Sequence, residues 1–320
     1  MPRDLSNSVV VITGASSGIG RAAAQLFADQ GSRLVLAARA ERPLNDVVAE
    51  CERRATRALA VPTDVGDEDA VERLAQAAVD RFGSLDVWVN GAGVMSYGHF
   101  EQVPANVFRA VIETNLLGQV HGARAALRRF RARRSGVLIN MSSVWGRVSA
   151  PDVSAYVTSK FAVRAFSECL REELRDEPNI HVATMLPQAV DTPIFERAAN
   201  YSGRPARPIP PILDPKTVAE GIVACARSPK HEVTYSRAGR LIELVHATLP
   251  SLWQRFLPPA FEEGNYAEMA AAPTAGGVLE PQPTPYAVYG GWRKQRKLEM
   301  WRALRDSLRG LVRGFRRSSS

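Results

Sequence analysis

The sequence predicts an α/β fold in which helices cover both faces of a parallel sheet of about seven strands. Two observations lead to this prediction. Short runs rich in β-branched residues alternate with longer segments of helical periodicity, and several of the short runs are apolar throughout. Strands that are apolar on both faces fit the interior of a parallel sheet. Strand–helix alternation builds right-handed crossover units, and hence a doubly wound sheet.

The expected elements follow one another in regular order. The first strand is the apolar run Val-Val-Val-Ile, and the fifth contains Gly-Val-Leu-Ile. Arginines gather at the end of the fourth helix, where cations suit the negative end of the helix dipole. The expected strands cover residues 8–13, 33–38, 58–62, 86–90, 136–141, 181–186 and 232–236. The expected helices cover residues 19–30, 43–54, 68–82, 105–133, 153–175 and 215–226.

Prolines mark two changes in the character of the chain. Five prolines between 201 and 215 predict a loop, and seven between 250 and 285 are expected to break any long element after residue 249. We therefore expect one α/β domain over residues 1–245. A proline-rich extension over 246–291 is expected to lie on that domain, followed by a basic tail over 292–320.

The net charge of +8 is local to that tail. Residues 292–320 hold ten basic and two acidic residues, so the 31 basic and 31 acidic residues of the remainder balance. A nucleic-acid-binding domain is expected to carry basic residues across its folded face, so this class is not favoured. The three cysteines and five histidines show no metal-ligand spacing, and we expect no metal site and a reducing compartment.

A glycine-rich turn stands between the first strand and the first helix. Gly14 permits a tight turn, Gly18 lets the backbone approach a pyrophosphate, and Gly20 allows close packing of the helix. The helix N-terminus then offers N–H groups to the anion. The turn is therefore interpreted as a dinucleotide-binding loop of the Rossmann type, against the alternative of an ordinary tight turn.

Tyr156 and Lys160 lie four residues apart, which is about one helical turn, so a helix places both on one face. The unperturbed pKa of a tyrosine is about 10, and a nearby cation lowers it. Ser143, thirteen residues upstream, could hold a carbonyl or alcohol oxygen beside the phenol. The three groups could together move a proton to or from an oxygen on carbon, although an exposed helical pair is the simpler alternative.

Taken together, these motifs resemble the short-chain dehydrogenase/reductase family. The resemblance runs from Thr13 to Thr192 and is expected to reach about residue 240. It implies that Ser16, Ser17, Ile19 and the three loop glycines hold the cofactor. It also implies that Tyr156 is the general acid and base, that Lys160 also holds the nicotinamide ribose, and that Ser143 positions the substrate oxygen. Further positions that match the family's cofactor-binding pattern are Asp64, Val65, Asn90, Ala92, Gly93, Val190 and Thr192.

Cofactor choice is predicted from the end of the second strand. Ala38 stands where NAD-dependent members of the family carry an acidic residue, and Arg39 follows it. An arginine there could pair with a 2′-phosphate, so NADP is expected and NAD is less favoured; the alternative for Arg39 is an ordinary surface residue. Gln188 replaces the glycine usual in the family and tolerates fewer backbone torsions, which leaves the nicotinamide contacts less certain.

The resemblance assigns Asn115 to a water that links Lys160 to solvent; a helix-interior polar residue of no consequence is the alternative. An apolar carbonyl or alcohol is the expected substrate, because the expected pocket segments offer mainly apolar side chains. These are Met95, Tyr97, Trp145, Val148, Ile194 and Phe195, which could equally be core residues. An alternative function is a nicotinamide-binding interaction or sensor module that uses the basic tail to reach a membrane or partner.

The tail shows apolar residues at spacings of three and four with arginines between them. This pattern predicts a basic amphipathic helix, which either lies on an anionic membrane surface or docks on its own subunit. No apolar stretch reaches 18 residues, so the expected location is cytoplasmic, with peripheral contact at the inner membrane surface through the tail. By resemblance, the helices over 105–133 and 153–175 would pair subunits into homodimers or homotetramers.

Overall fold

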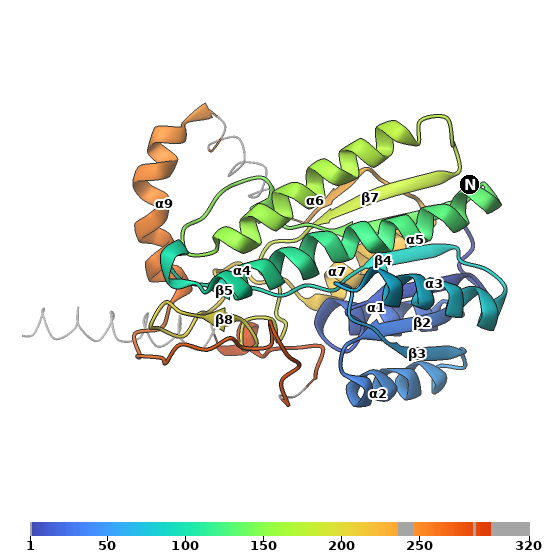
Figure 1. Cartoon of the computed structure of the whole chain (residues 1–320), viewed down its shortest axis with the longest axis horizontal. Helices are drawn as coiled ribbons and strands as arrows, with labels where there is room; N and C mark the ends of the chain where they lie inside the picture. The colour runs from blue at the N-terminus through green and yellow to red at the C-terminus, as the bar shows by residue number, and fades with distance from the viewer. Residues whose placement is uncertain (1, 236–245, 247, 284–285, 296–320) are drawn as a thin grey trace, which may run out of the picture.

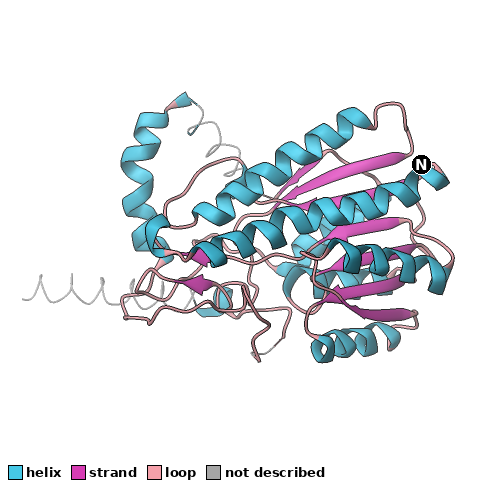
Figure 2. Ribbon diagram, in the orientation of Figure 1, coloured by secondary structure: helices cyan, strands magenta, loops and turns pink. Residues whose placement is uncertain are grey.

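A parallel sheet of seven strands forms the centre of the computed structural model, which describes residues 2–235, 246, 248–283 and 286–295. The strand order is β3-β2-β1-β4-β6-β7-β9, so the chain winds outward from β1 in both directions (Figures 1 and 2). The strands are β1 Val9–Thr13, β2 Arg33–Ala38, β3 Ala58–Pro62, β4 Val87–Asn90, β6 Gly136–Met141, β7 Ile180–Leu186 and β9 Glu232–Thr234. The predicted doubly wound α/β fold is confirmed.

Helices cover both faces of the sheet, as the alternating strand pattern requires. Along β1, Val10 and Ile12 face one helical layer, whereas Val9 and Val11 face the other. The first layer is formed by α1 Gly18–Asp29, α2 Glu41–Glu52 and α7 Pro215–Arg227. The second layer is formed by α3 Glu68–Phe82, α5 Gly118–Arg133 and α6 Ser154–Glu173.

The expected helix over 105–133 is divided at Asn115. It consists of α4 Ala105–Ile112, a π-helical turn Glu113–Leu117, and α5. The Asn115 side chain leaves the helix surface to bond both backbone groups of Val94, at 2.8 and 2.9 Å. A wider turn at this point lets a polar side chain reach a neighbouring loop, which helical periodicity does not reveal.

The extension is more ordered than its prolines predict. Residues Pro250–Asn265 form the helix α9, so the expectation that prolines break every long element after residue 249 is wrong. Pro250 occupies the first turn, where a missing N–H group costs little. The small parallel pair β5 Ser96–Tyr97 and β8 Ala199–Asn200, also unexpected, lies near the base of α9 (Figure 1).

The basic amphipathic helix expected in the tail falls mainly on residues 296–320, which lie outside the described residues. Among the residues that the structure describes, no helix combines the length and apolar character needed to cross a membrane.

Close packing between β4 and α5 yields a test of the fold. A Cβ atom on Gly122 would lie 2.2 Å from Asn90 Oδ1 and 2.6 Å from Trp88 Nε1. We expect Gly122→Ala to lower the free energy of unfolding by about 1–3 kcal/mol, because those side chains are fixed by hydrogen bonds to each other. Chemical denaturation measures the change.

Gly264→Ala is the matched control, since its Cβ atom would meet Ile209 only at 3.5 Å. An alanine inside α9 should leave stability unchanged or raise it by roughly 0.5–1 kcal/mol. Equal effects at both positions would contradict the packing argument.

Candidate active site

A cavity of about 470 Å³ lies at the carboxyl edge of the sheet. It is lined by the segments that follow β1, β2, β3, β4, β6 and β7, and α9 contributes to its wall. The strand order reverses between β1 and β4, and ligands of open parallel sheets bind outside the carboxyl ends at such a switch point. The fold thus brings motifs from the whole first two-thirds of the chain to one place.

The glycine turn is shaped by close approach of the backbone. Gly14 has a φ of +68°, and a Cβ atom there would lie 2.7 Å from backbone atoms of Ala92. A Cβ atom on Gly20 would lie 2.3 Å from the carbonyl oxygen of Gly14. No other residue fits these two positions without moving the backbone. Ser16, Ser17, Gly18 and Ile19 complete the turn and all line the cavity.

Arg39 lies at the cavity as predicted, but its guanidinium group already has partners. It donates to the carbonyl oxygens of Gly277, Val278 and Leu279 at 2.6, 3.0 and 3.3 Å. These residues belong to a segment that we call the C-terminal strap, residues 275–283 and 286–293. Asp64, Val65 and Ala92 line the same part of the cavity.

The strap continues across the glycine turn. The Gly18 N–H donates to the carbonyl oxygen of Ala287 at 2.9 Å, and Arg21 donates to that of Tyr286. The far end of the strap is held by Asp191, whose carboxylate accepts from the Trp292 N–H at 2.7 Å. The strap therefore covers the cofactor side of the cavity with its own carbonyl groups.

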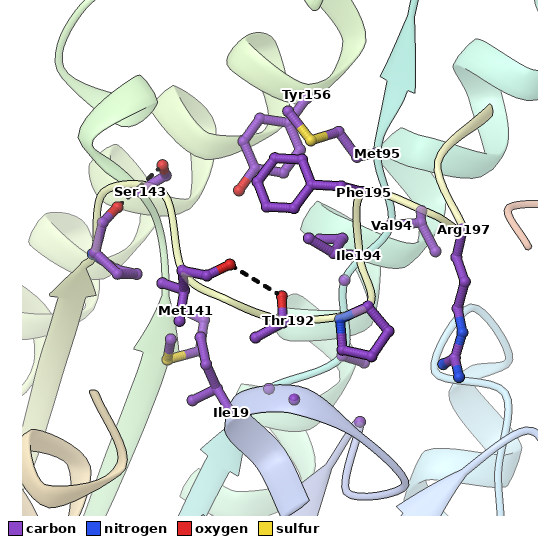
Figure 3. A pocket seen from close by; sticks show the side chains of 18 of the residues that line it. Ile19, Val94, Met95, Met141, Ser143, Tyr156, Thr192, Ile194, Phe195 and Arg197 are labelled. Atoms are coloured by element: carbon purple, nitrogen blue, oxygen red, sulfur yellow. Dashed lines mark hydrogen bonds between the residues drawn. The ribbon is translucent and has the colours of Figure 1, made fainter. Parts of the chain in front are cut away.

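Arg197 links the strap to the glycine turn. Its guanidinium carbon lies 3.8 Å from the centre of the Tyr286 ring, and its Nη1 atom donates to Ser17 Oγ at 3.2 Å. Figure 3 shows Arg197 pointing away from Tyr156. Arg197, Tyr286 and the strap were not predictable from the sequence, because nothing in their local pattern marks them as cavity residues.

Tyr156, Lys160 and Ser143 come together as their spacing predicts. Tyr156 and Lys160 lie on α6, with the Lys160 Nζ atom 5.4 Å from the centre of the Tyr156 ring. Ser143 follows β6, and its hydroxyl group faces the Tyr156 phenol. Lys160 is 4% exposed and donates to the carbonyl oxygen of Met141 at 2.8 Å.

Burial controls the titration of this pair. It raises the pKa of Tyr156 to about 12, and the hydrogen bond with Ser143 opposes the rise only in part. It lowers the pKa of Lys160 to about 8. In the protein alone the net result is a raised Tyr156 pKa, because desolvation of the phenolate dominates. That Lys160 lowers the Tyr156 pKa stays a prediction.

Asn115 and Asn90 lie behind the cavity wall. Besides bonding Val94, Asn115 Nδ2 donates to Ser159 Oγ at 3.1 Å. Asn90 donates to the carbonyl oxygen of Gln119 and to Asn140 Oδ1, and it accepts from Trp88. Neither asparagine is among the residues that line the cavity, and a cofactor-binding role for Asn90 stays a prediction. The bond to Asn140 ties β4 to β6, and the bond to Gln119 ties β4 to α5.

Gly93 brings the Asn115 network close to Lys160. A Cβ atom on Gly93 would lie 3.5 Å from Asn115 Oδ1 and 3.9 Å from Lys160 Nζ. Gly93 itself lines the cavity. Asn115 is therefore placed to fix the loop over Lys160, whatever its relation to water.

The segment after β7 adopts ordinary torsions despite the replaced glycine. Gln188 has no positive φ, and its Nε2 atom donates to the carbonyl oxygen of Pro211 at 3.0 Å. Val190 and Thr192 line the cavity, and Thr192 meets Gly18 across it, since a Cβ atom on Gly18 would lie 3.1 Å from the Thr192 side chain. The concern that glutamine would strain this backbone is not supported by the torsion.

The other end of the cavity is mainly apolar. Figure 3 shows Tyr156 beside Met95, Ile194 and Phe195, and these four belong to one packed cluster. From α9, Phe261 packs edge-on against Trp145, with ring centres 5.8 Å apart. All the apolar side chains expected here line the cavity, namely Met95, Tyr97, Trp145, Val148, Ile194 and Phe195.

The residues present fit a nicotinamide dinucleotide. The glycine turn lets a ligand approach the backbone closely, and α1 begins there at Gly18, so its N-terminus faces a bound phosphate. Lys160 supplies a buried cation beside the Tyr156 phenol. No group of three His, Cys, Asp or Glu side chains among the described residues could hold a metal ion.

Comparison with known proteins agrees with this geometry. The family model described as short chain dehydrogenase matches residues 8–201. The uncharacterised oxidoreductase YxnA of Bacillus subtilis is 34% identical over 280 residues, which cover 87% of this chain and 79% of that protein. Dehydrogenase/reductase SDR family member 7B of Danio rerio is 33% identical over 265 residues, covering 79% and 85%.

Solved structures show the same fold with nicotinamide cofactors. A short chain dehydrogenase/reductase from Burkholderia phymatum, in complex with NAD, superposes with a TM-score of 0.71 at 27% identity and covers 78% of this chain and 96% of its own. An alcohol dehydrogenase from the archaeon Thermococcus sibiricus, complexed with 5-hydroxy-NADP, has a TM-score of 0.62 at 28% identity and covers 71% and 95%.

The buried Lys160 yields a prediction about stability and pH. Its folded pKa of about 8 lies below the ordinary lysine value of 10.5. Between these values the unfolded chain holds the proton and the folded chain does not, so stability rises with pH there. Relative to Lys160→Met, the wild type should therefore gain on the order of 2 kcal/mol in unfolding free energy between pH 7 and pH 10. Denaturation of both proteins at each pH measures the difference.

Lys216→Met, at an exposed position on α7, is the matched control and should show no comparable trend. A Lys160→Met difference that stays constant from pH 7 to pH 10 would show that the ammonium is not desolvated in the folded protein.

Proposed function

This chain belongs to the short-chain dehydrogenase/reductase family, and we propose that it interconverts a carbonyl group and an alcohol with a nicotinamide dinucleotide. The observation that carries the proposal is the meeting of Tyr156, Ser143 and Lys160 in one cavity with the glycine turn. When bound, the nicotinamide supplies or accepts the hydride. The protein's own task is then to position the substrate oxygen and to exchange its proton.

In the proposed mechanism Ser143 and Tyr156 hold the substrate oxygen between them. Tyr156 donates its proton as the oxygen of a carbonyl gains negative charge, and it accepts the proton in the reverse reaction. The Ser143 hydroxyl group stabilises charge on the same oxygen. Lys160 places a positive charge near the phenol and offers its remaining donors to the nicotinamide ribose.

The pKa of Tyr156, about 12 in the protein alone, favours the acid role at neutral pH. The phenol is then protonated and ready to donate to a carbonyl oxygen. Lys160, with a pKa of about 8, keeps most of its charge at pH 7.

We further propose NADP(H) as the preferred cofactor. Ala38 supplies no acid for a ribose 2′-hydroxyl, and Arg39 is held at the cavity by neutral carbonyl groups. Among the described residues, no carboxylate forms an ion pair with Arg39. A 2′-phosphate would bring the opposite charge that the site lacks. NAD remains the less favoured cofactor.

The expected substrate is an apolar carbonyl compound or alcohol, because aromatic and aliphatic side chains line the end of the cavity beside Tyr156. Homodimers or homotetramers, a cytoplasmic location and contact of the tail with the inner membrane surface stay predictions. The division of the chain into a domain over residues 1–245, an extension over 246–291 and a tail over 292–320 also stays a prediction. The same holds for the water assigned to Asn115. The alternative of a nicotinamide-binding sensor module is not favoured by family membership.

The role of Tyr156 is tested by Tyr156→Phe. The variant should lower the rate of NADPH-dependent reduction of hydrophobic ketones and aldehydes by about 10²–10⁴-fold, because it removes the proton donor. Cofactor affinity, measured by fluorescence titration, should stay within a few-fold of wild type. Initial rates of NADPH oxidation provide the readout.

Tyr235→Phe is the matched control, since Tyr235 is another enclosed tyrosine, donates to the Val218 carbonyl oxygen and does not line the cavity. It should keep the wild-type rate. A wild type that binds NADPH yet reduces no carbonyl and oxidises no alcohol would support the sensor module instead.

The cofactor proposal is tested by Arg39→Ala. The ratio of NADPH to NADH affinity should fall by roughly 10–100-fold, because a charge-assisted contact with the 2′-phosphate is lost. The ratio is used because Arg39→Ala also removes hydrogen bonds to the strap, and a looser strap would change the NADPH and NADH affinities by the same factor. Arg42→Ala, exposed on α2, is the control. An unchanged ratio in Arg39→Ala would remove Arg39 from cofactor selection.

A further inference from the structure

The apolar end of the cavity contains a polar group that the proposed chemistry does not use, the side-chain amide of Asn265. Asn265 is the last residue of α9, is only 3% exposed and lines the cavity. Its Nδ2 atom has no hydrogen-bond partner among the residues that the structure describes. A buried amide left unpaired is destabilising, so its place in this wall points to a ligand.

Asn265 is also held firmly in place. Its backbone carbonyl oxygen accepts a hydrogen bond from the backbone N–H of Arg207 at 2.8 Å. The next residue, Tyr266, pairs with Ala206 in a β-bridge and donates its hydroxyl group to Asp152 Oδ2 at 3.0 Å. The fixed backbone at Asn265 and Tyr266 limits the positions that the Asn265 amide can reach, which lowers the entropy cost of binding a ligand there.

Tyr97 joins Asn265 in this wall. It is 1% exposed, and its ring centre lies 6.1 Å from that of Tyr266, the residue after Asn265. The Asn265 amide lies near the Tyr97 hydroxyl group but outside hydrogen-bond geometry, and it opposes the rise in pKa that burial causes. A negative charge on Tyr156 would raise the Tyr97 pKa further, so the two phenols are near each other. Tyr97 thus stays protonated, and it stands with Asn265 close to the reacting phenol.

We propose that Asn265 and Tyr97 bind a second oxygen of the substrate, in addition to the one held by Tyr156 and Ser143. The enzyme then prefers apolar carbonyl compounds that carry a further neutral, hydrogen-bond-accepting oxygen near the reacting carbon. This inference rests on the proposed function.

The chemistry of the wall defines the class of that second group. Asn265 Nδ2 can only donate, so its partner must accept. Phe261 and Trp145 pack together beside it, and an apolar enclosure penalises a carboxylate much more than a neutral oxygen. A ketone, ester, ether or hydroxyl oxygen satisfies both conditions.

The test uses two ketones of matched apolar body, 1-phenylpropane-1,2-dione and 1-phenylpropan-1-one. Asn265→Leu should lower kcat/KM for the dione about tenfold more than for the monoketone, because only the dione offers an oxygen to the amide. Comparing each substrate with its own wild-type rate removes the greater intrinsic reactivity of the dione. Tyr97→Phe should also lower kcat/KM for the dione more than for the monoketone, because it removes the second group that binds the added oxygen.

Glu262→Gln, three residues upstream on α9 and exposed, is the matched control and should leave both rates at the wild-type value. Thermal denaturation shows that each variant is folded at the assay temperature. Equal losses on the two ketones in Asn265→Leu, or no loss on either, would overturn the proposal.

A binding measurement separates this inference from the proposed function. Calorimetric titration of the dione into Tyr156→Phe loaded with NADP should show an affinity about tenfold higher than into the Tyr156→Phe, Asn265→Leu double variant. If the wild type reduces neither ketone, the proposed reaction fails, and this titration alone decides the role of Asn265. Equal affinities would refute that role.

Discussion

The ammonium group of Lys160 is buried beside the Tyr156 phenol, and much of the surrounding structure serves to hold it there. A charge so far from solvent is costly unless polar groups surround it. The Met141 carbonyl oxygen at the end of β6 accepts one of its hydrogen bonds. Asn115 holds the loop at Val94 in place, and Gly93 leaves room for both groups. The π-helical turn is the local distortion that this arrangement requires.

Two parts of the chain share the cavity between them. The sheet, its loops and α6 supply the glycine turn and the Tyr156, Lys160 and Ser143 group. The extension supplies the walls: α9 encloses the apolar end, and the strap covers the cofactor side. The extension thus adds to walls that the loops of the sheet also build, and it can change without altering the glycine turn or the Tyr156, Lys160 and Ser143 group.

Features encoded by short-range pattern were predictable from the sequence. The Tyr156–Lys160 spacing, the glycine turn and the alternation of strands and helices each depend on neighbours a few residues apart. The place of Asn265 in the cavity wall was not predictable, because it depends on packing near Tyr97, which lies far away in the chain. The partners of Arg39 were missed for the same reason. The rise in the Tyr156 pKa was not predictable, because burial is a property of the assembled fold and not of the motif.

On the proposed binding of a cofactor phosphate at the glycine turn, the Ala287 carbonyl group competes with it for the Gly18 N–H. A carbonyl group tethered beside an amide acts at a high effective concentration, whereas an arriving phosphate comes from dilute solution. An anion that takes the Gly18 N–H must first displace that carbonyl. The apparent binding free energy of the cofactor is therefore the difference between the free energy of binding the phosphate and that of the internal contact with the Ala287 carbonyl group. A cut in the peptide backbone between the strap and the rest of the molecule would change that affinity without touching a residue of the glycine turn.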